Sequence, residues 1–153
     1  MRSQNTKYSI VITTFDRRFE SHFIPLMQDI HNQNNSPPNE IIVMINGPHR
    51  SDFNQEYRRK ILAFLSGYEK VYPTMFPNFQ SLSKLWNRGI LTAQNDMVLV
   101  LNDDLRLEPM FFESLDEKIT NHSRTFRING SFSHYVAFKP ELIEVGFFDE
   151  RLL

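Results

Sequence analysis

The sequence predicts an α/β fold, with a mostly parallel sheet and helices on both of its faces. Short apolar runs rich in β-branched residues alternate with longer segments whose apolar residues recur every three or four positions. The run at 97–101 is apolar at every position, which is typical of a central strand covered on both faces. This succession of strands and helices favours right-handed crossovers between parallel strands.

The first half of the chain divides into strands and helices by the spacing of its apolar residues. The expected strands are 8–14, 40–45 and a weaker one at 69–72, and the expected helices are 18–31 and 53–65. Residues 34–39 are polar and proline-rich, so we expect a loop there. The Asn-Gly-Pro sequence at 46–48 ends the second strand, because Gly and Pro both interrupt a ladder.

The second half begins with the clearest helical pattern of the chain. The expected helices are 81–93, 108–120 and a short one at 140–145 entered at proline, and the expected strands are 97–101 and 131–138. Gly89 lies inside the first of these helices, where a glycine costs about 1 kcal/mol relative to alanine. We therefore expect the helix backbone to approach a neighbouring element closely at Gly89.

The composition is that of one ordinary globular domain. The chain has 153 residues, of which 41% are hydrophobic and 23% charged. Its 17 Lys+Arg and 18 Asp+Glu give a net charge of −1, which excludes a protein held to nucleic acid by bulk charge. The absence of cysteine excludes disulfides, thiolate metal sites and cysteine nucleophiles. The polar start and the lack of a long apolar run predict a cytoplasmic protein without a membrane span.

Polar residues follow three of the expected strands at the edge where an open parallel sheet binds ligands. They are residues 13–17 after the first strand, Asn46 after the second and Asn102-Asp103-Asp104 after the central one. Two adjacent carboxylates on such a turn are costly unless they are neutralised, and a divalent cation with oxygen ligands would do so. The alternative is a solvated turn whose acid caps the next helix. The position after the most hydrophobic strand favours a metal and nucleotide site.

The order of these segments resembles a family 2 glycosyltransferase of the GT-A fold, which is Rossmann-like. The resemblance covers residues 8–151. The segments that carry it are Thr13-Thr14-Phe15-Asp16-Arg17, Glu40-Ile41-Ile42-Val43 with Asn46-Gly47, Asn87-Arg88-Gly89-Ile90, Asn102-Asp103-Asp104, and Val145-Gly146-Phe147-Phe148-Asp149-Glu150-Arg151. It implies one nucleotide-sugar-binding domain over residues 1–153. It also implies transfer of a sugar from a nucleotide-diphosphate sugar to an acceptor hydroxyl, usually with inversion and with Mn²⁺ or Mg²⁺.

For the base of the donor, the resemblance implies contacts with residues after the first two strands. Thr13 and Phe15 would line the base pocket, and the Phe15 ring could stack on the base. Asn46 falls where the family usually has an acid that contacts the base, and with the family it favours a uridine or thymidine diphosphate sugar. The residues expected beside this pocket are Thr14, Asp16 and Arg17.

For the diphosphate and the metal, the resemblance points to the segment after the central strand. Asn102-Asp103-Asp104 matches the family's Asp-X-Asp motif with its first acid replaced. Asp104 would bind the metal, and Asp103 would contact the ribose or the metal and its water shell. The residues expected to face the donor's sugar or diphosphate are Lys84 and Asn87.

For the catalytic base, the resemblance points to the end of this sequence or beyond it. In the family it generally lies downstream of the Phe-Asp-Glu segment, and this sequence ends at Leu153, so we expect the acceptor-binding region to be missing. Asp149 and Glu150 are the candidate bases, although both could simply cap a turn. The acceptor, whether a glycan, a lipid-linked sugar or a protein, is not identified by the sequence.

Two alternatives to a transferase stay open at this point. The first is a fragment that binds the donor without transferring the sugar. The second is a flavodoxin-like signalling or interaction module such as a phospho-acceptor receiver. A receiver needs paired acids after its first strand, and Thr13-Thr14-Phe15 at that place counts against it.

Overall fold

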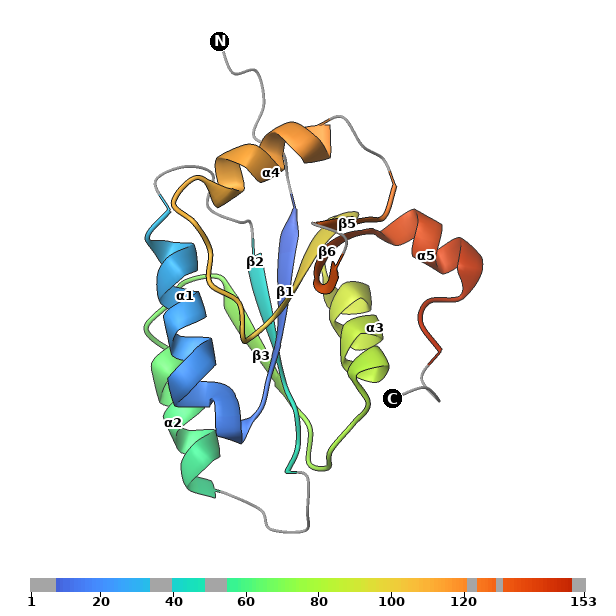
Figure 1. Cartoon of the computed structure of the whole chain (residues 1–153). Coiled ribbons are helices and arrows are strands. Elements are labelled where there is room, and N and C mark those ends of the chain that lie inside the picture. Colours follow the sequence, from blue (N-terminus) through green and yellow to red (C-terminus); the bar gives the residue numbers. More distant parts are fainter. Residues whose placement is uncertain (1–7, 34–39, 49–54, 121–123, 129–130, 150–153) are drawn as a thin grey trace.

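The computed structural model describes residues 8–33, 40–48, 55–120, 124–128 and 131–149, which contain one six-stranded sheet (Figure 1). The strands are β1 (Ser9–Thr14), β2 (Glu40–Ile45), β3 (Val71–Met75), β4 (Met97–Asn102), β5 (Phe126–Ile128) and β6 (Ser131–Phe138). Their order is β3-β2-β1-β4-β6-β5. Strands β3, β2, β1 and β4 are parallel, whereas β6 and β5 continue the sheet in antiparallel pairs. The predicted mostly parallel α/β sheet is therefore confirmed.

In the described residues, five α-helices connect and cover the strands. They are α1 (Ile24–His31), α2 (Gln55–Leu65), α3 (Leu82–Thr92), α4 (Phe111–Thr120) and α5 (Lys139–Val145). In Figure 1, α1 and α2 lie together on one side of the sheet and α3 on the other, while α4 crosses near the upper end. The carboxyl ends of β1 and β2 point to the lower edge of the same view.

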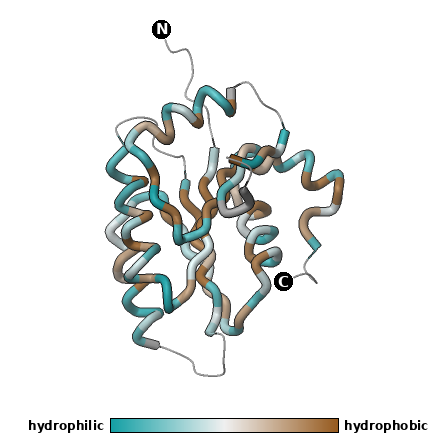
Figure 2. Tube along the Cα trace, in the orientation of Figure 1, coloured by the Kyte–Doolittle hydropathy of each residue, from teal (hydrophilic) through white to brown (hydrophobic). Residues whose placement is uncertain are grey.

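The core consists of two hydrophobic clusters separated by the sheet. Successive side chains of a strand point to opposite faces, so Ile10 and Ile12 join one cluster and Val11 joins the other. The first cluster is completed by α1, α2 and α4, and the second by α3 and α5. In Figure 2 the hydrophobic colour concentrates along the inner strands, whereas the helices alternate between hydrophobic and hydrophilic positions. Helices cover both faces, as the sequence predicts.

The close approach predicted at Gly89 is confirmed. A Cβ atom on this residue would lie 2.5 Å from Val11 Cγ1 and 3.3 Å from Met44 Cγ. Because both neighbours are buried on the sheet, the backbone of α3 packs directly on β1 and β2. The helix starts at a cap in which the Ser81 hydroxyl accepts a hydrogen bond from the Lys84 N–H at 3.2 Å. This packing fixes the start of α3 next to the carboxyl ends of the strands.

Several element boundaries differ from the sequence prediction. The helix expected at 18–31 begins with a 3₁₀ turn (Asp16–Arg18) and a π turn (Phe19–Phe23) before α1. Strand β3 lies further along the chain than expected and contains Pro73, which is tolerated because β3 is an edge strand. Strand β5 was not predicted, since its three residues carry no periodic signal. The loop expected at 34–39 and the first two residues of the helix expected at 53–65 lie outside the described residues.

Candidate donor-binding site

A cavity of about 410 Å³ opens where β1, β2 and β4 end. Thr13 and Asn102 face each other across these strand ends, and the Thr13 hydroxyl donates a 3.4 Å hydrogen bond to Asn102 Oδ1. The lining residues are Thr13, Thr14, Phe15, Arg18, Asn46, Phe79, Gln80, Ser81, Leu82, Leu85, Asn102, Asp103 and Asp104. The structure therefore brings together most of the residues that the sequence places after the three strands, with the exception of Asp16 and Arg17.

Asp103 is the buried acid of this cavity. Only 3% of its side chain is exposed. Its Oδ2 accepts a 2.9 Å hydrogen bond from the Thr14 hydroxyl, and its Oδ1 accepts a 3.1 Å hydrogen bond from Arg18 Nη1. Burial raises the pKa of Asp103, while the hydrogen bonds from Arg18 and Thr14 oppose this shift. The carboxylate is thus held in place by one strand residue and one cation.

Asp104 is the accessible acid, with 42% of its side chain exposed. Its Oδ2 lies 3.4 Å from Arg18 Nη1, so a single guanidinium nitrogen lies between the two acids. The guanidinium carbon of Arg18 also lies 5.5 Å from the centroid of the Phe15 ring. Arg18 was not predicted as a site residue from the sequence. In the sequence, Arg18 is only the second of two adjacent arginines. Which of the two reaches the acids is decided by the 3₁₀ turn after Phe15, and the sequence does not show this turn.

Asn46 holds the part of the cavity wall that is formed by the end of β2 and the segment before α3. Its Oδ1 accepts hydrogen bonds from the Gly47 N–H at 2.9 Å and the Gln80 N–H at 2.8 Å, and its Nδ2 donates to the Gln80 carbonyl at 3.0 Å. A Cβ atom on Gly47 would lie 2.3 Å from the Asn78 backbone, so the wall is packed against the end of β2. The structure shows Asn46 as a loop anchor at the cavity, and its contact with a base stays a prediction.

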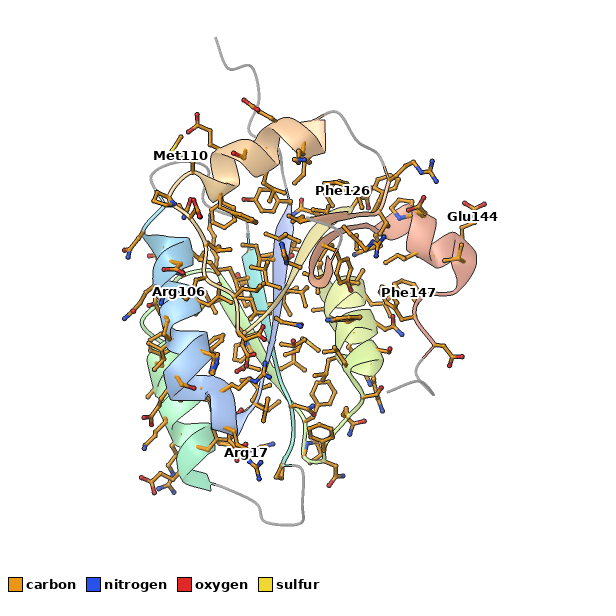
Figure 3. All side chains as sticks on the ribbon, viewed as in Figure 1. Arg17, Arg106, Met110, Phe126, Glu144 and Phe147 are labelled. Atoms are coloured by element: carbon orange, nitrogen blue, oxygen red, sulfur yellow. The ribbon has the colours of Figure 1, made fainter. Side chains whose placement is uncertain are left out.

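Asp16 and Arg17 line a different depression, of about 370 Å³, together with residues of α2. Both side chains are exposed, and Asp16 Oδ1 accepts a 2.9 Å hydrogen bond from the Arg17 N–H. Figure 3 shows Arg17 at the lower edge of the molecule. The structure therefore does not place these two side chains in the donor cavity, because the 3₁₀ turn directs them outward.

Asn87 and Lys84 also lie outside the donor cavity. The Asn87 amide pairs with the backbone of Phe148, donating to its carbonyl at 2.8 Å and accepting from its N–H at 3.0 Å. Asn87 and the exposed Asp149 line a third cavity beside the segment that follows α5. Glu150 lies outside the described residues. Neither Asn87 nor Lys84 lines the donor cavity, and Asn87 anchors the segment that follows α5, so contact of these two residues with the donor's sugar or diphosphate stays a prediction.

The residues present fit a divalent cation that shares its ligands with a diphosphate. Within the described part of the chain, no three or more His, Cys, Asp or Glu side chains gather in a metal-binding group. Mg²⁺ is commonly bound through one or two carboxylates together with substrate phosphates. Asp104 and Asp103 provide this set at the cavity, with Asp104 the more accessible. These two carboxylates are thus suitable ligands for the Mn²⁺ or Mg²⁺ expected from the sequence, and the binding of that metal stays a prediction.

The loop that leaves Asp104 is tied to α1. Asp29 accepts hydrogen bonds from Arg106 Nε at 2.7 Å and Nη2 at 3.0 Å, and from the Leu107 N–H at 2.9 Å. The hydrogen bond from Arg106 is the main reason why the pKa of Asp29 lies below its usual value. Figure 3 shows Arg106 beside α1. This ion pair fixes the path of the chain directly after the two acids.

The fold and the cavity together define a GT-A-type α/β domain with two acids after a central strand. Within this class, the chain belongs to glycosyl transferase family 2, whose family model matches residues 9–138. The family expected from the sequence is confirmed.

Solved structures of S. aureus TarS are similar to this chain in fold. The structure of TarS 1–349 in complex with UDP matches with a TM-score of 0.72 and 13% identity over 96% of this chain and 51% of that chain. The complex with UDP-GlcNAc gives a TM-score of 0.72, 13% identity and coverage of 96% and 50%. The chain thus spans about half the length of these structures. A comparison with curated proteins finds no significant match.

No helix in the described ranges is both long enough and apolar enough to cross a bilayer.

Proposed function

We propose that this chain binds a nucleotide-diphosphate sugar in the cavity at the ends of β1, β2 and β4. In the whole protein, the sugar would then be transferred to an acceptor hydroxyl with inversion. The observation that carries the proposal is the meeting of Phe15, Asp103 and Asp104 around one cavity. The fold match to TarS structures with UDP and UDP-GlcNAc supports a uridine-type donor, and a thymidine-type donor is the alternative.

The residues of this chain would act by binding and orienting the donor. The Phe15 ring offers a face for base stacking, and the strand-end residues Thr13 and Asn102 offer polar groups to the ribose. Asp104, with Asp103 beside it, would hold Mn²⁺ or Mg²⁺. Such a metal offsets the negative charge that develops on a leaving diphosphate. The Asn46-anchored wall would limit access of water to this side of the cavity.

A non-catalytic donor-binding role is the second candidate. Among the described residues that line the donor cavity, Asp103 and Asp104 are the only acids, and both face Arg18. Asp149 lines the third cavity instead. A general base must lie within hydrogen-bond reach of the proton it removes. If Asp149 does not serve in this way, the base must come from a residue outside the described lining of the donor cavity. The cytoplasmic location expected from the sequence stays a prediction.

Titration calorimetry with UDP, in Mn²⁺ and in EDTA, tests the proposal. The wild-type chain should bind UDP more tightly with Mn²⁺, and Asp104→Ala should remove this dependence. Asp149→Ala is the matched control, because Asp149 is an exposed acid away from the cavity and its loss should leave UDP binding intact. Absence of UDP binding under both conditions would refute the donor site. Metal-dependent binding that survives in Asp104→Ala would refute the assignment of the metal.

A further inference from the structure

The Arg18 side chain contacts both the two acids and the aromatic ring of the proposed donor site. Arg18 Nη1 lies 3.1 Å from Asp103 Oδ1 and 3.4 Å from Asp104 Oδ2. The guanidinium carbon of the same residue lies over the Phe15 ring, 5.5 Å from its centroid. The proposed metal would need the acids, and the proposed base would need the ring. Arg18 therefore stands where both parts of a donor complex would bind.

We propose that Arg18 is an internal counter-cation for Asp103 and Asp104 that leaves the acids when metal binds and leaves the Phe15 ring when a base stacks there. The proposal rests on the proposed function, because it concerns the same cavity. It assigns a role to Arg18, which was not among the site residues expected from the sequence.

The burial of Asp103 explains why a counter-cation is needed. With only 3% of its side chain exposed, its carboxylate has little access to water, and an unpaired buried charge is strongly unfavourable. The Thr14 hydroxyl satisfies one oxygen, but it contributes no charge. Arg18 provides the positive charge at the other oxygen. A cation must therefore be near Asp103 whenever this carboxylate is ionised, and Arg18 or a metal could fill that role.

The exposure of Arg18 explains why it could be replaced. Its side chain is 38% exposed, so the guanidinium can return to water without a large desolvation cost. Its contact with the 42% exposed Asp104 is of the kind that contributes little to stability. A contact of a cation with an aromatic face at a partly exposed site is also weak. The guanidinium is therefore held well enough to neutralise Asp103 and weakly enough to exchange.

Because Arg18 contacts both the acids and the Phe15 ring, metal binding and base stacking should be coupled. If metal binding moves Arg18 off the acids, the Phe15 ring is uncovered as well, and base stacking uncovers the acids in turn. Each ligand should then raise the affinity of the other by the same factor, because coupling of equilibria is reciprocal. Removal of the guanidinium should increase the affinity for metal alone and weaken the coupling.

The test compares Mn²⁺ binding to the wild-type chain, to Arg18→Gln and to Arg17→Gln, first with Mn²⁺ alone and then with UDP present. Calorimetry or electron paramagnetic resonance of Mn²⁺ reports binding without any need for activity. Arg18→Gln should bind Mn²⁺ alone about fivefold more tightly, as expected for the loss of one partly exposed competing ion pair. UDP should then increase its Mn²⁺ affinity less than it does for wild type.

Arg17→Gln is the matched control. It removes the same charge one residue away, from a side chain that contacts neither acid in the donor cavity and lines the other depression. Its Mn²⁺ affinity should equal that of wild type, and thermal unfolding of each variant verifies the fold. Equal or weaker Mn²⁺ binding by Arg18→Gln would overturn the proposal, and so would no Mn²⁺ binding to any of the three proteins. Failure of the wild-type chain to bind UDP would refute the proposed function, but the comparison with Mn²⁺ alone would still decide the role of Arg18.

Discussion

The two ends of the sheet both carry a buried carboxylate next to β1, yet only one of them has the geometry of a site. At the amino end, Glu40 is 5% exposed, and its Oε2 accepts hydrogen bonds from the Ser9 hydroxyl at 2.7 Å and the Gln94 N–H at 2.6 Å. At the carboxyl end, Asp103 accepts from the Thr14 hydroxyl and from Arg18. Glu40 lines none of the three cavities described above, whereas Asp103 lines the donor cavity.

This difference lies in the partners rather than in the burial of the acids. The partners of Glu40 are a hydroxyl and a backbone N–H, and Asn95 Nδ2 donates in turn to the Ser9 hydroxyl at 3.0 Å. The hydroxyl belongs to a residue of β1 and the N–H to the backbone after α3, so neither group is carried by a long, exposed side chain. Asp103 shares its second oxygen with a long, partly exposed side chain that can leave. A buried carboxylate thus indicates a binding site only when one of its partners is exchangeable.

The strongest test exchanges each acid for its isosteric amide. Asp103→Asn should lower metal-dependent UDP affinity by at least about tenfold. It should alter the free energy of unfolding by less than about 1 kcal/mol, because the cation that loses its partner is a partly exposed guanidinium that can return to water. Glu40→Gln should leave UDP affinity unchanged. It should lower the free energy of unfolding by about 2 kcal/mol, because two hydrogen bonds to a buried charge become neutral. Calorimetry and urea unfolding measure the two effects.

Either of two results would break this comparison. If Glu40→Gln weakens UDP binding without loss of stability, the amino end communicates with the donor cavity and is not purely structural. If Asp103→Asn unfolds the chain, the hydrogen bonds of Asp103 are as fixed as those of Glu40. Arg18 would in that case be part of the framework.

The loop after the two acids provides a smaller, pH-dependent test. The pKa of Asp29 is lowered by Arg106, so the ion pair stabilises the fold above the usual Asp value of 3.8. Its contribution is lost as the pH falls through the lower pKa of the folded state. Asp29→Asn should therefore cost about 1 kcal/mol at neutral pH, and the difference from wild type should shrink as the pH falls below 3.8. Urea unfolding across this pH range measures it, and a constant difference would contradict the assignment.

Sequence patterns were sufficient for the parts of the structure that have a local cause. Strand β2 matches the predicted 40–45, because its apolar run is bounded by polar residues and by Asn46-Gly47-Pro48. The position of Asp103 and Asp104 at a sheet edge followed from the hydrophobic strand before them. Strand β5 had no such signal, since its three residues are stabilised by pairing with β6. The four inner strands and their ends were therefore predictable, whereas the edge strand β3 was displaced from its predicted range and the edge strand β5 was missed.

The side-chain partners depend on contacts between distant segments and could not be predicted in the same way. Asn87 pairs with Phe148, a contact that no spacing within α3 indicates. The Asn46 amide forms hydrogen bonds with the backbone of Gln80. Its position after a strand had suggested contact with a base instead. Arg18 differs from Arg17 only through the turn that carries them. Motif position identifies the edge of the sheet, but the turn geometry decides which residues face the cavity.

Asp16→Asn provides the smallest expected effect and tests this last point. Asp16 is exposed, lines the separate depression and accepts a hydrogen bond from the neighbouring Arg17 N–H. An amide can accept the same hydrogen bond, so UDP affinity should change less than about twofold and stability by less than about 0.5 kcal/mol. Calorimetry beside wild type measures the affinity. A tenfold loss would mean that the turn of residues 16–18 refolds when the donor binds, because Asp16 reaches the donor only if this turn moves. In that case the backbone at the carboxyl end of the sheet would rearrange when the donor binds, in addition to the Arg18 side chain. The two ends of the sheet would then differ more than the exchange of Arg18 alone implies, because the hydrogen bonds of Glu40 at the amino end stay fixed.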